Sequence, residues 1–335
     1  MATAVPKAAM RLRTPTTCLA ALFLDSSAAF SFSSSSSSRR ALTTPAFAGR
    51  MDPTTSVHSV TSQASRASAA AGASSAILRA ASTSTDADAA EIDVASNLAD
   101  VQGKIEAKVD ECHRPKGSVR LVAVSKTKPL NLLRDAYQAG QRAFGENYAQ
   151  ELMAKAADMP PDVAWHFIGP LQSNKAAQLV RRVGLPQLAC VETVASKKLA
   201  SKLNNAVDGL EEEDGEEGQR LGIYLQVNTS GESSKSGLAP GSELIDLATD
   251  IAATCPRLSI DGLMTIGAPG DLSCFDALVR CREEVAQALG VDVDSLDLSM
   301  GMSGDYEHAI ERGATSVRVG STIFGARDYS NLNKK

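Results

Sequence analysis

The 335-residue chain contains 43% hydrophobic residues, few aromatic residues and a formal net charge of −5. This length and composition allow a sizeable core in one large domain or two small ones. No run of about 18 apolar residues occurs, so no membrane-spanning helix is expected. The six cysteines form no C-x-x-C pair and do not cluster in sequence with the four histidines, so a zinc site is not expected either.

Residues 1–88 differ in composition from the rest of the chain. Up to Thr85 they include eight basic and only two acidic residues, many Ala, Ser and Thr, and the tract SFSSSSSSRR. Such a composition is typical of an organellar transit peptide, and a low-complexity tail without an address is the alternative. We therefore expect a disordered leader that directs the chain to a plastid or a mitochondrion. Without that role, the chain is expected in the cytoplasm.

Beyond the leader the chain is acidic. From residue 86 onward it has 26 basic and 37 acidic residues, a net charge of −11. This balance argues against a broad nucleic-acid-binding surface. Much of the excess lies in DGLEEEDGEEGQR (208–220), whose glycines and like charges are typical of a solvated loop. We expect a surface insertion at 208–217, with an interaction tail as the alternative, and the sequence assigns it no role.

From residue 95 the sequence alternates between helical and strand-like patterns. Leu98, Val101, Ile105 and Val109 recur at helical spacing, which predicts a helix over 97–112. Short apolar runs follow, separated by helix-like segments. The expected strands are 119–125, 142–146, 163–169, 188–192, 221–228, 260–266, 296–300 and 316–320. The expected helices between them are 129–140, 149–159, 174–184, 242–255, 274–290 and 305–314.

Strands that alternate with helices of this length imply parallel strands joined by crossovers. About eight such units over roughly 240 residues match a (β/α)8 barrel of the TIM type. We expect residues 89–335 to form one such barrel with an extra amino-terminal helix. A doubly wound open sheet is the alternative, but its first strand would normally lead into a glycine-rich turn, and SKTKP (125–129) is not one.

The segment SVRLVAVSKTKPL (118–130) runs an apolar strand directly into Lys126. Active sites of such barrels lie at the carboxyl ends of the strands, and lysine is rarely buried without a reason. Counting by twos, Lys126 shares a face with Val122 and Val124. Partial desolvation at an apolar mouth favours the neutral amine, which is a nucleophile toward carbonyl compounds. We therefore predict that Lys126 forms a Schiff base, and an exposed lysine at a strand end is the alternative.

Glycine- and serine-containing loops follow the expected seventh and eighth strands. One carries Ser303 and Gly304, and the other carries Gly320 and Ser321; each leads into a helix. Glycine permits close backbone approach, and many barrels bind phosphate in these two loops. For Ser303 the alternative is a plain helix cap. A lysine facing a phosphate site suggests a ligand with an aldehyde at one end and a phosphate at the other, and pyridoxal 5′-phosphate fits.

Arg318 and His166 lie inside the expected strands, and only Arg318 is expected to contribute to the same site. Arg318 shares a strand face with Gly320 and therefore points into the barrel if Gly320 lines the mouth. A guanidinium beside the ring nitrogen of the ligand would disfavour its protonation and weaken the ring as an electron sink. An ion pair with an inward carboxylate is the alternative for Arg318. His166 is expected to be a satisfied core group.

The chain resembles the pyridoxal phosphate homeostasis proteins, relatives of the amino-terminal barrel of alanine racemase. The resemblance covers 97–329 and rests on AVSKTKP, FGENY, WHFIGPLQSNK, KSG, GLMTI, LSMGMSGD and VRVGSTIFGARDY. The departures are the leader, the acidic insertion near 211–217, and Ser321, where threonine is common in the family. Only Ser321 touches the site, and either hydroxyl can donate to a phosphate.

The resemblance implies a monomeric or loosely associated fold-type-III barrel that binds pyridoxal 5′-phosphate. The residue matching Lys126 then forms the internal aldimine, and Asn147 in FGENY lines the pocket. The loops matching Ser303–Gly304 and Gly320–Ser321 hold the phosphate. Arg318 lies near the pyridine nitrogen.

Two classes of function remain. The first is a carrier without catalytic activity, which buffers the cofactor or delivers it to apo-enzymes. The second is an amino-acid racemase, which needs two bases on opposite faces of its substrate. In barrel racemases, the resemblance implies, a separate carboxyl-terminal domain supplies the second base, and here the chain ends at Lys335, shortly after the eighth unit. We therefore favour the carrier. A barrel enzyme for another phosphorylated substrate survives only if no cofactor binds.

Overall fold

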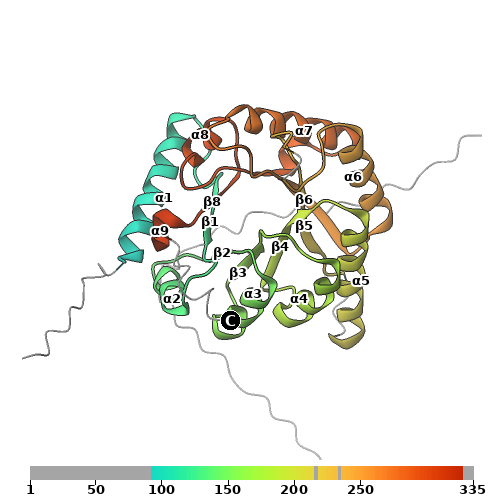
Figure 1. Ribbon diagram of the computed structural model, residues 1–335, viewed down its shortest axis with the longest axis horizontal. Helices are drawn as coiled ribbons and strands as arrows, with labels where there is room; N and C mark the ends of the chain where they lie inside the picture. Colours follow the sequence, from blue (N-terminus) through green and yellow to red (C-terminus); the bar gives the residue numbers. More distant parts are fainter. Residues whose placement is uncertain (1–91, 215–217, 233–234, 327–335) are drawn as a thin grey trace, which may run out of the picture. The chain divides into compact units, whose positions relative to one another are not determined.

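Eight parallel strands pair in chain order and close into a barrel, because the first strand also pairs with the eighth (Figure 1). The computed structural model describes residues 92–214, 218–232 and 235–326. The strands are β1 (Arg120–Val124), β2 (Ala143–Glu146), β3 (Ala164–Phe167), β4 (Leu188–Val194), β5 (Leu221–Gln226), β6 (Leu258–Met264), β7 (Asp297–Ser299) and β8 (Ser316–Val319). The predicted (β/α)8 barrel is confirmed, and the open-sheet alternative is excluded.

Helices surround the barrel (Figure 1). They are α1 (Val94–Glu111), α2 (Leu130–Gln138), α3 (Ala149–Asp158), α4 (Ala176–Val183), α5 (Lys197–Asp214), α6 (Ser242–Thr254), α7 (Ser273–Leu289), α8 (Tyr306–Glu311) and α9 (Ser321–Phe324), with short 3₁₀ turns at Ser173–Lys175 and Val293–Ser295. Among the described residues, none of these helices is long and apolar enough to cross a membrane. The expected leader lies outside the described residues and stays a prediction.

The extra amino-terminal helix is present as α1. The Asp93 side chain accepts a hydrogen bond from the Ser96 N–H at 3.0 Å and caps the start of the helix. The residues buried on α1 include the four that predicted it, Leu98, Val101, Ile105 and Val109. These side chains pack against α2, α8 and α9, so that α1 covers the side of the barrel where β1 meets β8.

The acidic stretch is a correction to the sequence prediction. The structure continues α5 through Asp214, so the expected loop is wrong for 208–214; residues 215–217 are not described. Glutamate has a high intrinsic helix propensity, and a helix that is already nucleated can extend through it despite like charges.

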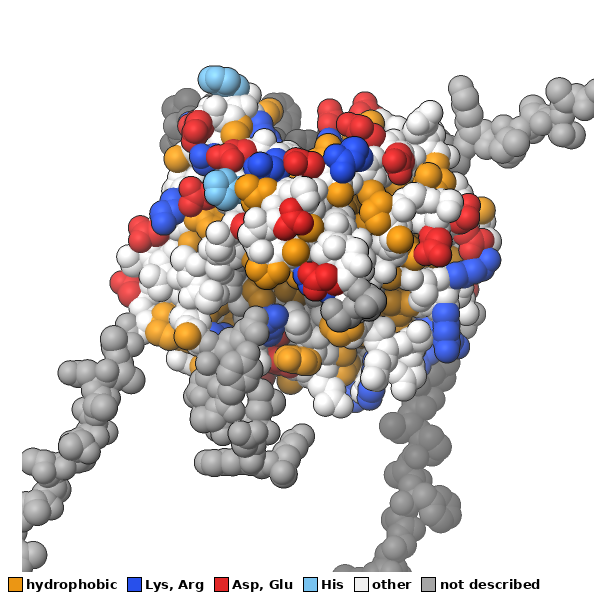
Figure 2. Space-filling view, turned by 45° about the horizontal axis from the view of Figure 1, so that its top comes forward, with side chains coloured by type: hydrophobic (Ala, Val, Ile, Leu, Met, Phe, Trp, Pro, Cys, Tyr) orange, Lys and Arg blue, Asp and Glu red, His pale blue; other side chains and the backbone are white. Residues whose placement is uncertain are grey.

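On the face shown in Figure 2, acidic and basic side chains are interspersed, with hydrophobic side chains exposed between them.

Side chains of β1 separate two environments. Leu121 and Ala123 belong to the main apolar core, which fills the layer between barrel and helices. Val122 is also fully buried but lies outside that core. A Cβ placed on Gly145 would lie 3.0 Å from Val122 Cγ1 and 3.5 Å from Val124 Cγ2. Val122 and Val124 therefore point into the barrel, while Leu121 and Ala123 point toward the helices.

Candidate functional site

The predicted site residues follow four strands that are neighbours in the closed barrel, β7, β8, β1 and β2. Lys126 follows β1 and Asn147 follows β2. Ser303 and Gly304 lie in the loop after β7, whereas Gly320 and Ser321 lie at the end of β8. Because parallel strands end at the same rim, all of these residues lie at one end of the barrel.

The direction of Lys126 follows from its neighbour on the chain. The Ser125 side chain is fully buried and donates to Glu146 Oε1 at 2.6 Å, on the helix side of the sheet. Side chains alternate along β1, and Lys126, at the start of the turn that follows the strand, comes next in the series of Val122 and Val124 on the barrel face. The Lys126 side chain is half-buried there. This placement agrees with the role predicted for Lys126, which remains a prediction.

The two expected phosphate loops meet directly. The Gly320 N–H donates to Ser303 Oγ at 3.2 Å, which joins the loop after β7 to the end of β8. A Cβ on Gly320 would lie 3.0 Å from the Val124 carbonyl oxygen and 3.2 Å from Val124 Cβ, so the backbones of β8 and β1 approach closely. Gly304 is exposed with open space where a Cβ would stand, and Ser321 opens the short helix α9. The hydroxyl hydrogen of Ser303 stays available to a ligand because Ser303 Oγ is the acceptor of the Gly320 bond.

Asn147 supplies an unsatisfied polar atom at the same rim. Its Oδ1 is buried and has no hydrogen-bond partner among the described residues. Gly169, after β3, packs so tightly on the Asn147 backbone that any Cβ at residue 169 would overlap the Asn147 carbonyl group. A buried amide oxygen without a partner is costly, which makes Asn147 a candidate ligand-binding group.

Arg318 lies below this rim inside the barrel and is only 4% exposed. Its Nη1 donates to Ser299 Oγ at 2.6 Å, and its Nη2 donates to the Thr265 carbonyl oxygen at 2.7 Å. Ser299 Oγ in turn donates to Glu192 Oε2 at 2.6 Å, and the direct distance from Arg318 Nη1 to Glu192 Oε2 is 3.9 Å. The inward ion pair considered as the alternative for Arg318 is therefore present.

Glu192 connects Arg318 to a histidine. His166 Nδ1 lies 2.7 Å from Glu192 Oε1, and both side chains are buried. Burial alone would raise the pKa of Glu192, but the hydrogen bond and charge of His166, the charge of Arg318 and the Ser299 hydroxyl together lower it. Glu192 is thus a buried carboxylate whose charge compensates that of Arg318. His166 is buried and its Nδ1 is paired with Glu192, in agreement with the expected core histidine.

Cys190 places a thiol against this network. Its Sγ lies 3.0 Å from His166 Nδ1, because neighbouring strands β3 and β4 pair residue 166 with residue 190. Cys190 and His166, which are 24 residues apart in sequence, are therefore neighbours in three dimensions. His166, Cys190 and Glu192 have ligand atoms close enough to hold a metal ion. Burial raises the pKa of the Cys190 thiol well above its usual range, so the arrangement favours a hydrogen-bonded cluster over a thiolate ligand set.

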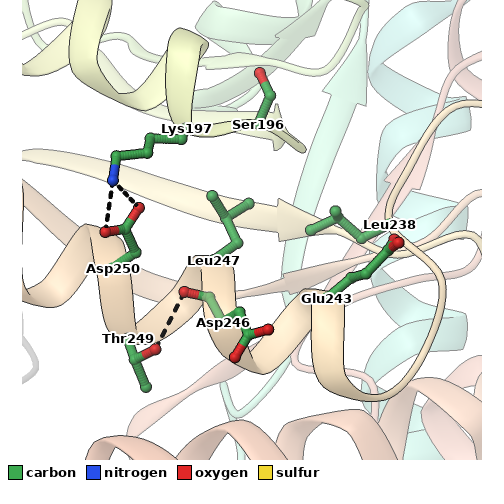
Figure 3. Close-up of a pocket in the computed structure, with 8 residues that line it drawn as sticks. All are labelled: Ser196, Lys197, Leu238, Glu243, Asp246, Leu247, Thr249 and Asp250. Carbon is green, nitrogen blue, oxygen red and sulfur yellow. Dashed lines mark hydrogen bonds and ion pairs between the residues drawn. The ribbon is translucent and has the colours of Figure 1, made fainter.

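Two cavities lie elsewhere on the described part of the chain. The first, of about 680 Å³, lies along α6 and the start of α5 (Figure 3) and is lined by residues that include Lys197, Glu243, Asp246 and Asp250. Lys197 Nζ and Asp250 Oδ1 lie 2.8 Å apart across it. The second, of about 360 Å³, lies between α1 and the starts of β1 and β2. Neither cavity is lined by a predicted site residue. The candidate site is therefore identified by the polar side chains that converge at the rim of the barrel and not by the size of a cavity.

Sequence reasoning missed the charged groups that support the site. Glu192, Glu146 and Lys155 are all buried and paired with other described residues. Their signal in the sequence is a charged residue inside an apolar run, such as Glu192 in LACVE or Glu146 in RAFGE. That signal indicates a buried charge but does not identify its partner.

Comparisons with known proteins agree with this architecture. The family described as alanine racemase, N-terminal domain, matches residues 102–328. The human pyridoxal phosphate homeostasis protein is 46% identical over 254 residues, covering 72% of this chain and 89% of that protein. The protein of the same name from Vibrio alginolyticus is 41% identical over 246 residues, covering 71% of this chain and 99% of that protein.

Solved structures of other proteins share this fold. PipY of Synechococcus elongatus PCC7942, solved with pyridoxal phosphate bound, is 33% identical with a TM-score of 0.54 and is matched over 69% of this chain and 100% of its own. Alanine racemase of Corynebacterium glutamicum is 14% identical with a TM-score of 0.51, over 70% of this chain and 62% of its own. The second likeness shows a shared fold alone.

The Arg318–Glu192 pair predicts a pattern of stability. In ligand-free protein, Glu192→Gln should lower the free energy of unfolding by about 3 kcal/mol, because it leaves the buried guanidinium without its counter-charge. The double variant Glu192→Gln/Arg318→Met should lose less, since it removes both charges. Urea unfolding measures both values. A single variant as stable as the parent protein would show that the pair does not hold the barrel interior together.

Proposed function

The chain belongs to the family of the alanine racemase N-terminal domain, among the pyridoxal phosphate homeostasis proteins, and on this premise we propose that it binds pyridoxal 5′-phosphate as a carrier. The carrier buffers this cofactor or delivers it to apo-enzymes. The observation that carries the proposal is that β1, which leads into Lys126, pairs with β8, whose end at Gly320 is joined to the Ser303 loop by a hydrogen bond.

The residues at the rim fit the cofactor. When bound, pyridoxal 5′-phosphate supplies a reactive aldehyde and a doubly charged phosphate. Lys126 would bind the aldehyde covalently, while the hydroxyl groups of Ser303 and Ser321 would donate to the phosphate. Asn147 offers a buried amide without a partner for Oδ1. This donor set matches the two ends of the ligand.

Arg318 supports a carrier more than a catalyst. Its guanidinium is fixed by Ser299, the Thr265 carbonyl and Glu192, so it stays charged and in place. We propose that it faces the ring nitrogen of the cofactor and keeps that nitrogen unprotonated. A ring without that proton withdraws electrons weakly, and carbanion chemistry is then poorly supported.

The racemase alternative requires a second base at the barrel mouth. Among the described residues, Tyr148 and Tyr306 follow β2 and β7, the strand ends that frame the candidate site. Tyr306 is buried, and burial together with Glu307 raises its pKa, so it keeps its proton and is a poor base. Tyr148 is 56% exposed at the start of α3, and no described contact holds its hydroxyl in place. This arrangement favours the carrier.

The first prediction concerns the amine. Purified protein incubated with pyridoxal 5′-phosphate should be yellow, and borohydride reduction should attach the cofactor to Lys126. Lys126→Ala should lose the visible band, because no other amine continues the barrel face of β1. Lys128→Ala is the matched control, since Lys128 Nζ donates to the Ala326 carbonyl oxygen. An adduct that maps by mass spectrometry to Lys128 or Lys175 would refute the assignment.

The second prediction concerns the phosphate. Replacing Ser303 and Ser321 together with alanine should weaken binding of pyridoxal 5′-phosphate at least about tenfold, because each bond to a charged group contributes about 1.5–3 kcal/mol. Pyridoxal without phosphate should bind the variant and the parent protein alike. Spectroscopic titration with both ligands measures the effect. Equal weakening of both ligands would place the phosphate elsewhere.

The third prediction separates carrier from racemase. Saturating alanine or serine in heavy water should show no α-proton exchange above that caused by free pyridoxal 5′-phosphate, as followed by NMR. Cofactor released from the protein should activate an apo-enzyme added to the solution. Exchange at about one turnover per second, the low end of ordinary enzyme rates, that is lost in Lys126→Ala would establish the racemase instead.

A further inference from the structure

The turn that carries Lys126 is held from outside the barrel by three charged side chains, Glu146, Glu151 and Lys155. We propose that these residues, the charged triad, position Lys126 for covalent capture of the aldehyde. This inference rests on the proposed function, because it concerns the same lysine. It adds three residues that do not reach the ligand and act through the backbone on both sides of Lys126.

Lys155 lies at the centre of the triad. It stands on the inner face of α3 and is only 8% exposed. Its Nζ lies 2.7 Å from Glu146 Oε1 and 2.7 Å from Glu151 Oε1. It also donates to the Ser125 carbonyl oxygen at 2.8 Å. The three hydrogens of the ammonium thus have three acceptors, and one of these belongs to the residue before Lys126.

The residue after Lys126 is held by the same triad. The Thr127 N–H donates to Glu151 Oε1 at 2.7 Å. On the other side, the Ser125 hydroxyl donates to Glu146 Oε1 at 2.6 Å. The Lys128 N–H closes the turn onto the Ser125 carbonyl oxygen at 3.0 Å. The peptide units that flank Lys126 are therefore fixed by charged groups.

The conformation of the turn shows why such support is needed. Thr127 has φ of 62°, in the left-handed region that a β-branched residue rarely adopts. Such a residue costs about 1–3 kcal/mol and persists only where surrounding contacts impose it. Here the imposing contact is the bond from the Thr127 N–H to Glu151, which is itself held by Lys155. The triad maintains a turn that the local sequence disfavours.

The charges of the triad do not balance, which argues against a simple stabilising role. When Glu146 is ionised, two carboxylates share one ammonium, and Glu146 Oε2 is buried without a hydrogen-bond partner among the described residues. Burial raises the pKa of Glu146 to about 7, although Lys155 opposes the shift. Apolar residues could fill this layer with less cost, as Leu152 and Ala156 do on the same helix. The charged residues are explained if their role is to hold the Ser125 carbonyl oxygen and the Thr127 N–H in place.

The triad lies apart from the barrel interior. Ser125 and Glu146 point toward α3, on the same side as Leu121 and Ala123, whereas Lys126 follows the opposite face. A ligand in the barrel mouth therefore meets Lys126 and does not meet Lys155. Loss of the triad should loosen the Lys126 amine while the phosphate loops after β7 and β8 stay intact.

A pair of ligands tests this prediction. Pyridoxal 5′-phosphate has an aldehyde that reacts with an amine, and pyridoxine 5′-phosphate has an alcohol in its place that does not. Lys155→Met should weaken binding of the aldehyde about tenfold and slow the rise of the visible band, because a charge-assisted hydrogen bond to the strand end is lost. Binding of the alcohol, measured by calorimetry, should stay within about twofold of that of the parent protein.

Two further variants complete the test, one as a second probe of the triad and one as a control. At a pH above the Glu146 pKa of about 7, Glu146→Gln/Lys155→Met removes one charge of each sign, so that it folds without a new net charge, and it should show the same selective loss. Lys108→Met is the matched control, since Lys108 also lies between two carboxylates, Glu111 at 2.7 Å and Glu311 at 3.0 Å, away from the turn. This control should bind both ligands like the parent protein.

The outcomes are distinguishable. An unchanged ratio of aldehyde to alcohol affinity in the folded double variant would overturn the positioning role. This includes the case in which both ligands bind more weakly by the same factor, because that result would show a general structural effect. A parent protein that binds aldehyde and alcohol equally well would instead refute covalent capture by Lys126, and with it that part of the proposed function.

Discussion

The pairing of β1 with β8 is the constraint on which the candidate site depends. Residues 120–123 pair with residues 316–319, and this contact joins the first and last strands and closes the barrel. It brings the turn that holds Lys126 beside the loops of Ser303 and Gly320. The conformational entropy lost on closing a loop grows only slowly with loop length. A contact over this sequence distance can therefore form once the intervening units have folded against one another. If this one pairing were lost, the amine and the phosphate loops would no longer share a rim.

Buried charge is organised in two separate sets around that rim. Inside the barrel, Arg318, Glu192 and His166 form a network through Ser299. Outside it, the charged triad holds the backbone that flanks Lys126. A buried charge is costly unless its partners are complete, so exchanging one member of a set alone leaves its partners uncompensated. The strand β1 and its turn separate the two sets, and in the roles proposed above one set would tune the ligand environment while the other would fix the amine.

The same barrel serves catalysts and carriers, so the fold does not decide the function. The likeness to alanine racemase of Corynebacterium glutamicum, at 14% identity, concerns the architecture alone. The proposed carrier function rests on the chemistry at the rim: Lys126 would hold the aldehyde, the loops of Ser303 and Gly320 would hold the phosphate, Arg318 would weaken the ring as an electron sink, and no described tyrosine is placed as a base. These features favour retention of the aldehyde over reaction at an amino-acid substrate.

The sequence by itself determined the alternation of strands and helices, the number of units and the lysine at the end of β1, because apolar periodicity reports directly which face of each element is buried. It misjudged 208–214, where helix propensity outweighed the loop-like charge pattern. It could not pair His166 with Cys190, or Lys155 with Ser125 and Glu146, because those contacts depend on strand register and on how α3 packs against the barrel. Only the tertiary structure decided the polar partners, since a periodicity indicates that a charged side chain is buried and packing alone fixes what neutralises it.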